Sequence, residues 1–312
     1  MNKFMKLAPA AIIIAALALV LMLGRNLLDS KLPTLSGSYY KDFKTEAELE
    51  MKFSQKGEFS VDDRTVETDD EVIGNISVWY PEGEEGEKFP VILVANASAN
   101  PASVYKPFFE RLASWGFVVV GNEESQTGKG EGMSKTLDVL FGLVDTHPLR
   151  EVMDYDNIGI VGFSQGGAGA LAAVTEYDNG DKIKAVYTGS AVCPEVAGEY
   201  GWEYDTSKIS VPWFMAAGTG DSDAGNEKDK VVGVSPYVFL MDSYDSMAES
   251  VPKVRARIVG AEHGDVLKRS DGYMTAWMLY QLKGDKEAAG VFEGKDAEIL
   301  NNANWQDVEK NL

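Results

Sequence analysis

The sequence predicts an α/β fold, with a mostly parallel central sheet and helices on both of its faces. Between residues 89 and 283, short apolar runs alternate with segments whose apolar residues recur at helical spacing. Two of these runs, 89–95 and 117–121, are almost entirely apolar, as expected of strands that are buried on both faces of a parallel sheet. Strands that alternate with helices build such a sheet through right-handed crossovers. A chain of 312 residues can hold one large domain of this kind or two small ones.

The first 30 residues have the pattern of a targeting segment. Lys3 and Lys6 precede an uncharged apolar run at 7–23, which is short for a membrane span and long for the core of a signal peptide. No small-x-small cleavage site follows this run. We therefore expect an uncleaved signal anchor that holds an exported body at the membrane. A cleaved signal peptide, and hence a secreted protein, is the alternative.

Residues 31–58 are polar and charged, and we expect them to form a stalk with a short helix. The pattern changes at Phe59, where apolar residues begin to alternate with polar ones. Short apolar segments at 59–61, 72–73 and 76–80 predict two or three edge strands with one face in water. We expect residues 59–312 to form one α/β domain.

The remaining elements continue the alternation of strands and helices. Pro107 can open a helix at its first position, and Gly116 can end it. The spacing of apolar residues across 137–144 predicts another helix with one apolar face. We expect helices at 108–115, 137–144 and 273–283, and strands at 158–163, 183–187, 211–217 and 254–259, the last strand of the sheet.

Residues 158–171 form a short apolar strand, a turn that carries a serine between glycines, and a helix of small residues. The turn has the G-x-S-x-G pattern of a nucleophile elbow, with Gly162 and Gly166 on either side of Ser164. Side chains at these two positions would collide in the strained turn, and glycine avoids that collision. The turn raises the Ser164 hydroxyl above the sheet, where the following helix directs free backbone N–H groups. The alternative is a small residue in an ordinary tight turn.

A serine hydroxyl needs a base to accept its proton, and near pH 7 this base is usually a histidine. The chain has two histidines. His147 precedes the elbow strand and should lie at the opposite end of the sheet, so we expect it to be structural or solvated. His263 follows the last expected strand, at the edge where Ser164 also emerges. His263 is therefore the predicted base, unless it is an ordinary loop histidine.

The third member of such a site is a carboxylate that orients the histidine. Two aspartates, Asp221 and Asp223, directly follow the expected strand at 211–217. We expect Asp221 to be the acid because it lies nearer the end of the strand. A calcium loop is the competing interpretation of 221–226, but its glycine comes one position too early and the acid at the twelfth position is missing.

An oxyanion hole needs two N–H donors. One should be the backbone of Gln165, and the other should come from the loop at 96–100, where Ser98 is the predicted donor. Ser98 could equally be a simple turn residue. The segment 193–207, with Trp202 and Tyr204, could form a wall of the substrate pocket or pack as a surface loop. The glycine-rich piece at 128–132 matches neither a P-loop nor a dinucleotide fingerprint.

The net charge of −20 argues against nucleic acid and other polyanions as partners. Cys193 is the one cysteine in the chain, so no intrachain disulfide and no cysteine zinc site can form. Two histidines also do not suffice for a histidine-rich metal site. We therefore expect no metal.

With these residues in place, the chain from about 59 to 284 resembles the α/β-hydrolase superfamily. It is most similar to the branch of dienelactone hydrolases, chlorophyllases and cutinase-like polyester hydrolases. The resemblance implies a triad in the order Ser164, Asp221 and His263, an acyl-enzyme intermediate, no cofactor and carboxylic-ester substrates. Polyester hydrolases commonly have an aromatic residue and a methionine where this chain has Ser98 and Gln165. The motifs that carry the resemblance lie at 112–120, 162–166, 218–222, 244–247 and 260–263.

The sequence therefore predicts an exported serine hydrolase, attached to the membrane by its N-terminal segment, that acts on a small or medium carboxylic ester. A peptidase or an acyltransferase on the same fold is an alternative, since the triad does not separate these activities. A non-catalytic binding module at the cell surface is a further alternative, although such a module does not need the three triad residues together.

Overall fold

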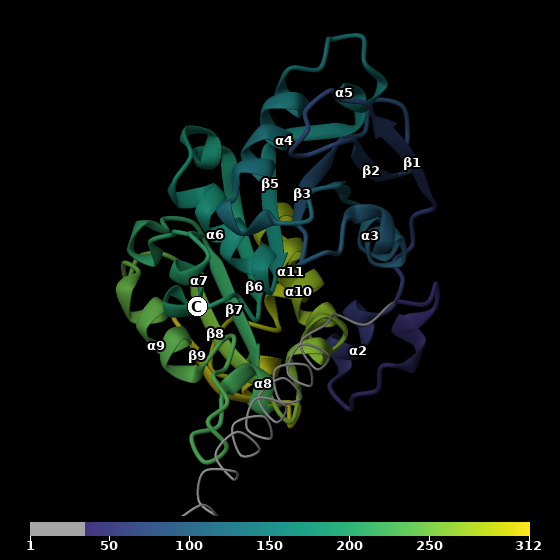
Figure 1. Cartoon of the computed structure of the whole chain (residues 1–312). Helices are drawn as coiled ribbons and strands as arrows, with labels where there is room; N and C mark the ends of the chain where they lie inside the picture. Colours follow the sequence, from purple (N-terminus) through teal and green to yellow (C-terminus); the bar gives the residue numbers. More distant parts are fainter. Residues whose placement is uncertain (1–34) are drawn as a thin grey trace, which may run out of the picture.

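A nine-stranded sheet runs through residues 35–312, the part of the chain that this computed structural model describes (Figure 1). The strand order is β1-β2-β4-β3-β5-β6-β7-β8-β9. The six strands from β4 to β8 are mutually parallel, whereas β1, β2 and β9 pair antiparallel at the two edges. The predicted α/β fold is thus confirmed. The strands are β1 (Val61–Val66), β2 (Ile76–Pro81), β3 (Phe89–Ala95), β4 (Val118–Asn122), β5 (Met153–Phe163), β6 (Ile183–Gly189), β7 (Trp213–Gly218), β8 (Lys253–Ile258) and β9 (Trp305–Lys310).

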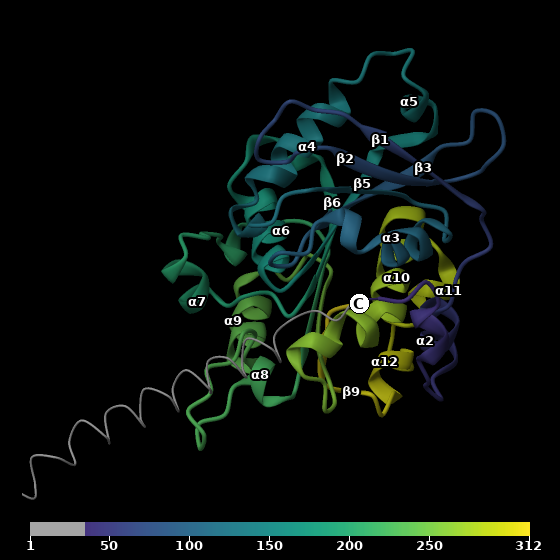
Figure 2. The ribbon, with the colours of Figure 1, turned by 45° about the vertical axis from the view of Figure 1, so that its right-hand side comes forward.

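Helices cover both faces of this sheet, with α4, α6 and α9 on one side and α3 and α10 on the other (Figure 2). In β3, Ile92 and Val94 belong to one buried cluster, while Val91 and Leu93 belong to the other. Successive side chains of a strand point to opposite faces, which explains why this strand is apolar throughout. The helices are α2 (Glu48–Ser54), α3 (Lys106–Ala113), α4 (Glu131–Phe141), α5 (Pro148–Val152), α6 (Gln165–Thr175), α7 (Pro194–Glu199), α8 (Asp221–Ala224), α9 (Tyr237–Ser246), α10 (Val266–Lys283), α11 (Lys286–Ala289) and α12 (Glu298–Asn301).

Two expected boundaries at the C-terminal side are wrong. The helix predicted at 273–283 begins seven residues earlier, as α10, because polar residues such as Asp271 interrupt its apolar pattern although they are buried. The strand at 254–259, expected to be the last, is followed by β9, which pairs antiparallel with β8. β9 has the polar sequence WQDVEK and lies at the sheet edge, so it lacks the apolar run by which we identified the other strands.

The segment expected to be a stalk packs against the domain instead. Its described residues, 35–58, include a short 3-10 helix, Tyr39–Asp42, and the expected short helix, which is α2. Figure 2 shows α2 beside α10, α11 and α12, far from it in the sequence. Phe53 of α2 is 1% exposed, and the buried Glu50 accepts hydrogen bonds from Trp305 and Asn302. Glu50 and Ser54 are the buried polar residues of this segment, and sequence alone does not separate such residues from solvated ones.

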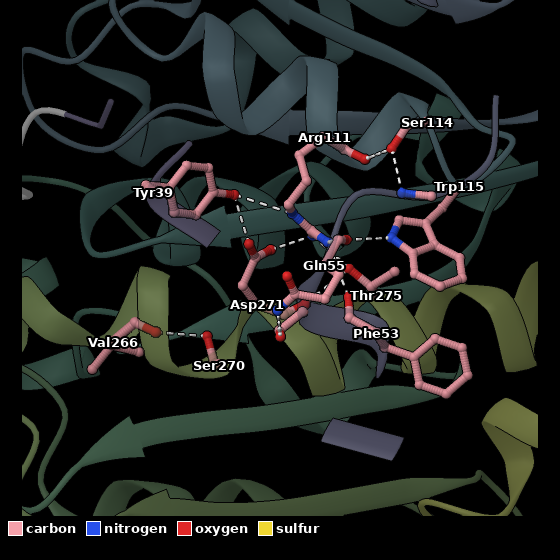
Figure 3. Close-up of polar contacts among 12 residues, drawn as sticks. Tyr39, Phe53, Gln55, Arg111, Ser114, Trp115, Val266, Ser270, Asp271 and Thr275 are labelled. Carbon is pink, nitrogen blue, oxygen red and sulfur yellow. Dashed lines mark hydrogen bonds and ion pairs between the residues drawn. The ribbon is translucent and has the colours of Figure 1, made fainter. Parts of the chain in front are cut away.

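A buried polar network fastens this segment to the domain (Figure 3). Arg111 of α3 forms an ion pair with Asp271 of α10, and both side chains are almost completely buried. The Tyr39 hydroxyl donates to Asp271 Oδ2 at 2.6 Å and accepts a hydrogen bond from Arg111 Nε at 3.1 Å. Arg111 also donates to the carbonyl oxygens of Phe53 and Gln55, at 2.9 and 3.1 Å, and to Thr275 Oγ1 at 2.6 Å. One arginine thus connects α3, α10 and the N-terminal segment.

Within residues 35–312 no helix combines the length and apolarity needed to cross a membrane. The signal anchor expected at residues 1–30 lies outside the described residues.

Candidate active site

Ser164 stands between the end of β5 and the start of α6, at the sharp turn that the sequence predicts. Its φ of 56° lies in the left-handed region, which few residues other than glycine adopt. A Cβ on Gly162 would lie 2.1 Å from the carbonyl oxygen of Gly166, and a Cβ on Gly166 would lie 2.1 Å from that of Ala95. Both glycines are therefore required for this turn to form against the neighbouring strand.

His263 lies between Ser164 and a buried carboxylate. Its Nε2 is 2.8 Å from Ser164 Oγ, and its Nδ1 is 2.8 Å from Asp223 Oδ1. His263 and Asp223 are buried, whereas Ser164 is half-buried. A carboxylate beside Nδ1 favours the tautomer with a proton there, which leaves Nε2 free to accept the proton of the serine hydroxyl. This order of serine, imidazole and carboxylate is the geometry of an activated nucleophile.

The carboxylate that contacts His263 is Asp223, so the prediction of Asp221 is wrong. The chain after β7 does not stay extended but turns into α8, whose first residue is Asp221. Residues two apart on a helix point in directions about 200° apart, so the side chains of Asp221 and Asp223 face opposite ways. Asp221 is exposed and accepts a hydrogen bond from Asn226 Nδ2 at 2.7 Å. Proximity to the strand end was therefore the wrong criterion.

The second oxygen of Asp223 has two donors of its own. Ser190 Oγ donates to Oδ2 at 2.5 Å, and the backbone N–H of Gly218 donates to the same oxygen. Since Oδ2 is held by these donors, Oδ1 is left facing the imidazole of His263. Neither residue was predicted to donate to the acid, and Ser190 lies three residues beyond the strand predicted at 183–187.

The loops that carry the aspartate and the histidine are fastened to each other. Glu262, directly before His263, accepts hydrogen bonds from both the backbone N–H and the hydroxyl of Ser222. The backbone N–H of His263 donates in turn to Ser222 Oγ at 3.0 Å. These contacts fix the separation between the two loops, and so between Asp223 and the imidazole.

The loop expected to supply the second oxyanion donor lies beside the elbow, as the contact between Gly166 and Ala95 requires. Ser98 is exposed in this loop, and Gln165 is the first residue of α6. The backbone N–H of Ala99 is already used, since it donates to the carbonyl of Ser125 at 3.1 Å. Gln165 directly follows Ser164, and Ser98 belongs to the loop that lies against the elbow. The role of both residues as oxyanion donors stays a prediction.

The loop at 122–127 supports this region and contains a buried acid. Asn96 donates from Nδ2 to the carbonyl oxygens of Asn122 and Glu124, both at 2.9 Å. Glu124 is 8% exposed, and its Oε2 has no hydrogen-bond partner among the described residues. Burial, with a smaller contribution from the negative charge of Glu131, raises the pKa of Glu124 to about 7.

Trp202 and Tyr204 have packing partners within the chain. The Trp202 ring lies over Gly128, where a Cβ would approach it to 2.4 Å, and stacks on Tyr200 with 4.7 Å between ring centroids. The Tyr204 hydroxyl donates to the carbonyl oxygen of Val192 at 2.5 Å, and burial raises the pKa of this tyrosine. These contacts favour a packing role for Tyr204, while substrate contact by either residue stays a prediction.

His147 lies away from these residues, before the start of β5 rather than after its end. Its Nδ1 accepts a hydrogen bond from the backbone N–H of Leu149 at 3.3 Å and so caps α5. This is the structural role expected of it. Across residues 35–312, no group of three or more histidine, cysteine, aspartate or glutamate side chains is placed to hold a metal ion.

Comparison with protein families finds a match to a model described as "PETase: PET hydrolase-like", over residues 43–286. The matched region includes Ser164, Asp223 and His263 together with α2. No curated protein matches the chain.

Proposed function

Because the chain belongs to the PET hydrolase-like family, which implies a serine ester hydrolase of the α/β-hydrolase fold, we propose that it cleaves a carboxylic ester through an acyl-enzyme on Ser164. The observation that carries this proposal is the pair of 2.8 Å contacts that His263 makes with Ser164 and Asp223. In this proposal the base and the acid are His263 and Asp223.

In the first half of the reaction, His263 Nε2 accepts the proton of Ser164 as Oγ attacks the ester carbonyl carbon. The carbonyl π electrons move to oxygen, and Asp223 stabilises the imidazolium that forms. When the carbon–oxygen bond to the leaving alcohol breaks, His263 gives its proton to that alcohol. An acyl group then remains on Ser164.

In the second half, water replaces the alcohol. His263 Nε2 takes a proton from the water while its oxygen attacks the acyl carbon, and the bond to Ser164 Oγ breaks as the proton returns to the serine. The negative oxygen that forms in both halves is stabilised by backbone N–H groups, which we assign to Gln165, at the start of α6, and to Ser98.

We assign a small or medium ester as the substrate. Polyester hydrolases commonly have an aromatic residue and a methionine at positions that Ser98 and Gln165 occupy here. The Gln165 side chain is buried and donates to Gln126 Oε1 at 2.9 Å. The exposed Ser98 offers less apolar contact to a long aromatic polymer than an aromatic residue would. The exported, membrane-attached location expected from residues 1–30 belongs to the same proposal.

The test is hydrolysis of 4-nitrophenyl butyrate by the purified full chain, with Ser164→Ala as the paired variant. The proposal expects saturable release of 4-nitrophenol by the wild type and a decrease on the order of 10⁶-fold in the variant. Parallel incubation with an anilide and with an acyl-accepting alcohol distinguishes peptidase and acyltransferase activity. Equal, background-level release by both proteins would exclude the esterase proposal.

A further inference from the structure

Ser190 is a buried residue with unusual backbone geometry between the nucleophile and the acid. It directly follows β6 and is 1% exposed. Its φ of 51° lies in the left-handed region, where a residue with a Cβ is strained. The residue before it, Gly189, accepts the backbone N–H of Ser164 at 3.0 Å. Ser190 therefore directly follows the residue that hydrogen-bonds to the nucleophile turn.

The contacts of Ser190 lead from that turn to the acid. Its backbone N–H donates to the carbonyl of Ala216 in β7 at 2.7 Å, which fixes its position between the two strands. Its hydroxyl donates to Asp223 Oδ2 at 2.5 Å, with both groups buried. A hydrogen bond to a buried carboxylate is stronger than one between neutral groups, because the carboxylate would otherwise lose its solvation without compensation.

Strain at such a position persists only where the surrounding contacts hold the residue in that conformation. Glycine would adopt the same φ without strain but would remove the hydroxyl. The strain of Ser190 thus coincides with a hydrogen bond that only its side chain can provide, to the carboxylate that orients His263.

We propose that Ser190 is a positioning residue that fixes the rotation of the Asp223 carboxylate. This inference rests on the proposed function. With the Ser190 hydroxyl and the Gly218 N–H both on Oδ2, the carboxylate has one orientation, in which Oδ1 accepts the Nδ1 proton of His263. Without the hydroxyl, Oδ2 keeps a single donor and the carboxylate can rotate away from the imidazole.

The test compares Ser190→Ala and Ser190→Gly in the full chain. Alanine removes the hydroxyl and keeps the backbone strain, whereas glycine removes both. Ser270→Ala is the matched control, since Ser270 is also buried and donates to a backbone carbonyl, that of Val266, at 2.7 Å. We expect both Ser190 variants to lower kcat by about 10- to 100-fold with KM changed less than about twofold. The control should keep the wild-type kcat.

A second readout does not depend on turnover. The proton between His263 Nδ1 and Asp223 should give a downfield proton NMR resonance in the wild type, and this resonance should shift or broaden in both Ser190 variants but not in Ser270→Ala. If both Ser190 variants kept kcat within about twofold and left the resonance unchanged, the inference would be overturned. A wild-type protein without esterase activity would refute the proposed function instead, and the resonance would then decide on Ser190 by itself. If alanine prevents folding, the glycine variant carries both measurements.

Discussion

Asp271 and Asp223 are both buried carboxylates with a nitrogen-bearing partner, yet the two networks end differently. Asp271 faces Arg111, whose guanidinium is always charged, and five hydrogen bonds connect that guanidinium to groups inside the protein. Asp223 faces His263, whose charge can change, and the other imidazole nitrogen faces the half-buried hydroxyl of Ser164.

The difference shows how similar groups stabilise the fold in one place and form a candidate active site in another. The network of Asp271 is closed, because each of its members bonds to another part of the same chain, and it holds residues 35–58 on the domain. The network of Asp223 is open at one end, where it reaches the half-buried Ser164. Glu124 is a third case, since its buried carboxyl Oε2 has no partner at all among the described residues.

The largest expected effect is on the open network. Asp223→Asn should lower kcat by about 10⁴-fold, because the amide favours the wrong tautomer of His263 and cannot stabilise its cation. Asp221→Asn is the matched control, two residues away and exposed, and should stay within about twofold of the wild type. Steady-state kinetics on 4-nitrophenyl butyrate measure both. A reversed result would return the role of the acid to Asp221.

The closed network should respond in stability and not in catalysis. Arg111→Ala leaves Asp271 buried without its partner, and we expect the free energy of unfolding to fall by about 3 to 5 kcal/mol. Lys52 lies in the same N-terminal segment and forms an exposed ion pair with Glu287 of α11. Lys52→Ala should change the free energy of unfolding by less than about 1 kcal/mol. Urea unfolding measures both, and kcat per folded molecule should remain that of the wild type. A large loss of kcat in folded Arg111→Ala would show that the two networks are not separate.

The unpartnered acid should make stability depend on pH. Burial raises the pKa of Glu124 from its ordinary 4.5 to about 7, so between these values the folded protein holds a proton that the unfolded chain has lost. The contribution of Glu124 therefore makes the free energy of unfolding fall as pH rises from 4.5 to 7, by up to about 3 kcal/mol. Glu124→Gln should remove this decrease and stabilise the protein at pH 8.

Glu85→Gln, at an exposed position between β2 and β3, is the control for Glu124 and should leave the pH dependence as it is. Denaturant unfolding at pH 5, 6, 7 and 8 provides the comparison. If the free energy of unfolding changed with pH equally in wild type and Glu124→Gln, the Glu124 carboxyl would have to be solvated or hydrogen-bonded in solution.

The smallest expected effect concerns a single hydroxyl of the closed network. Tyr39→Phe removes the donor to Asp271 Oδ2 and the acceptor of Arg111 Nε, and should lower the free energy of unfolding by about 1 to 2 kcal/mol. Tyr40→Phe, in the same turn, should have no comparable effect. A loss as large as that of Arg111→Ala would mean that the hydroxyl, and not the ion pair, holds the segment.

Local patterns were sufficient to predict much of the fold and part of the site. Continuous apolar runs located the parallel strands, and the glycines around Ser164 predicted the elbow, because both signals lie within a few residues. His263 could be predicted because loops that follow parallel strands meet at one edge of the sheet.

The errors arose where a short helical turn or a partner distant in sequence decides the structure. The choice between Asp221 and Asp223 depends on one helical turn after β7, which the apolar pattern does not reveal. The partner of Ser190 is 33 residues away, and Glu50 meets Trp305 across 255 residues. Buried polar residues of this kind have the same sequence pattern as solvated ones, so residues 31–58 were expected to form a stalk.

Labelling with a fluorophosphonate would show whether His263 activates Ser164. The full-length wild type, Ser164→Ala and His263→Ala would be treated under identical conditions, and the adduct located by mass spectrometry. We expect rapid modification of the wild type at Ser164, none at that position in Ser164→Ala and a rate lower by several orders of magnitude in His263→Ala. A folded wild type that remains unlabelled would rule out this activation. Equally fast labelling of His263→Ala would also rule it out.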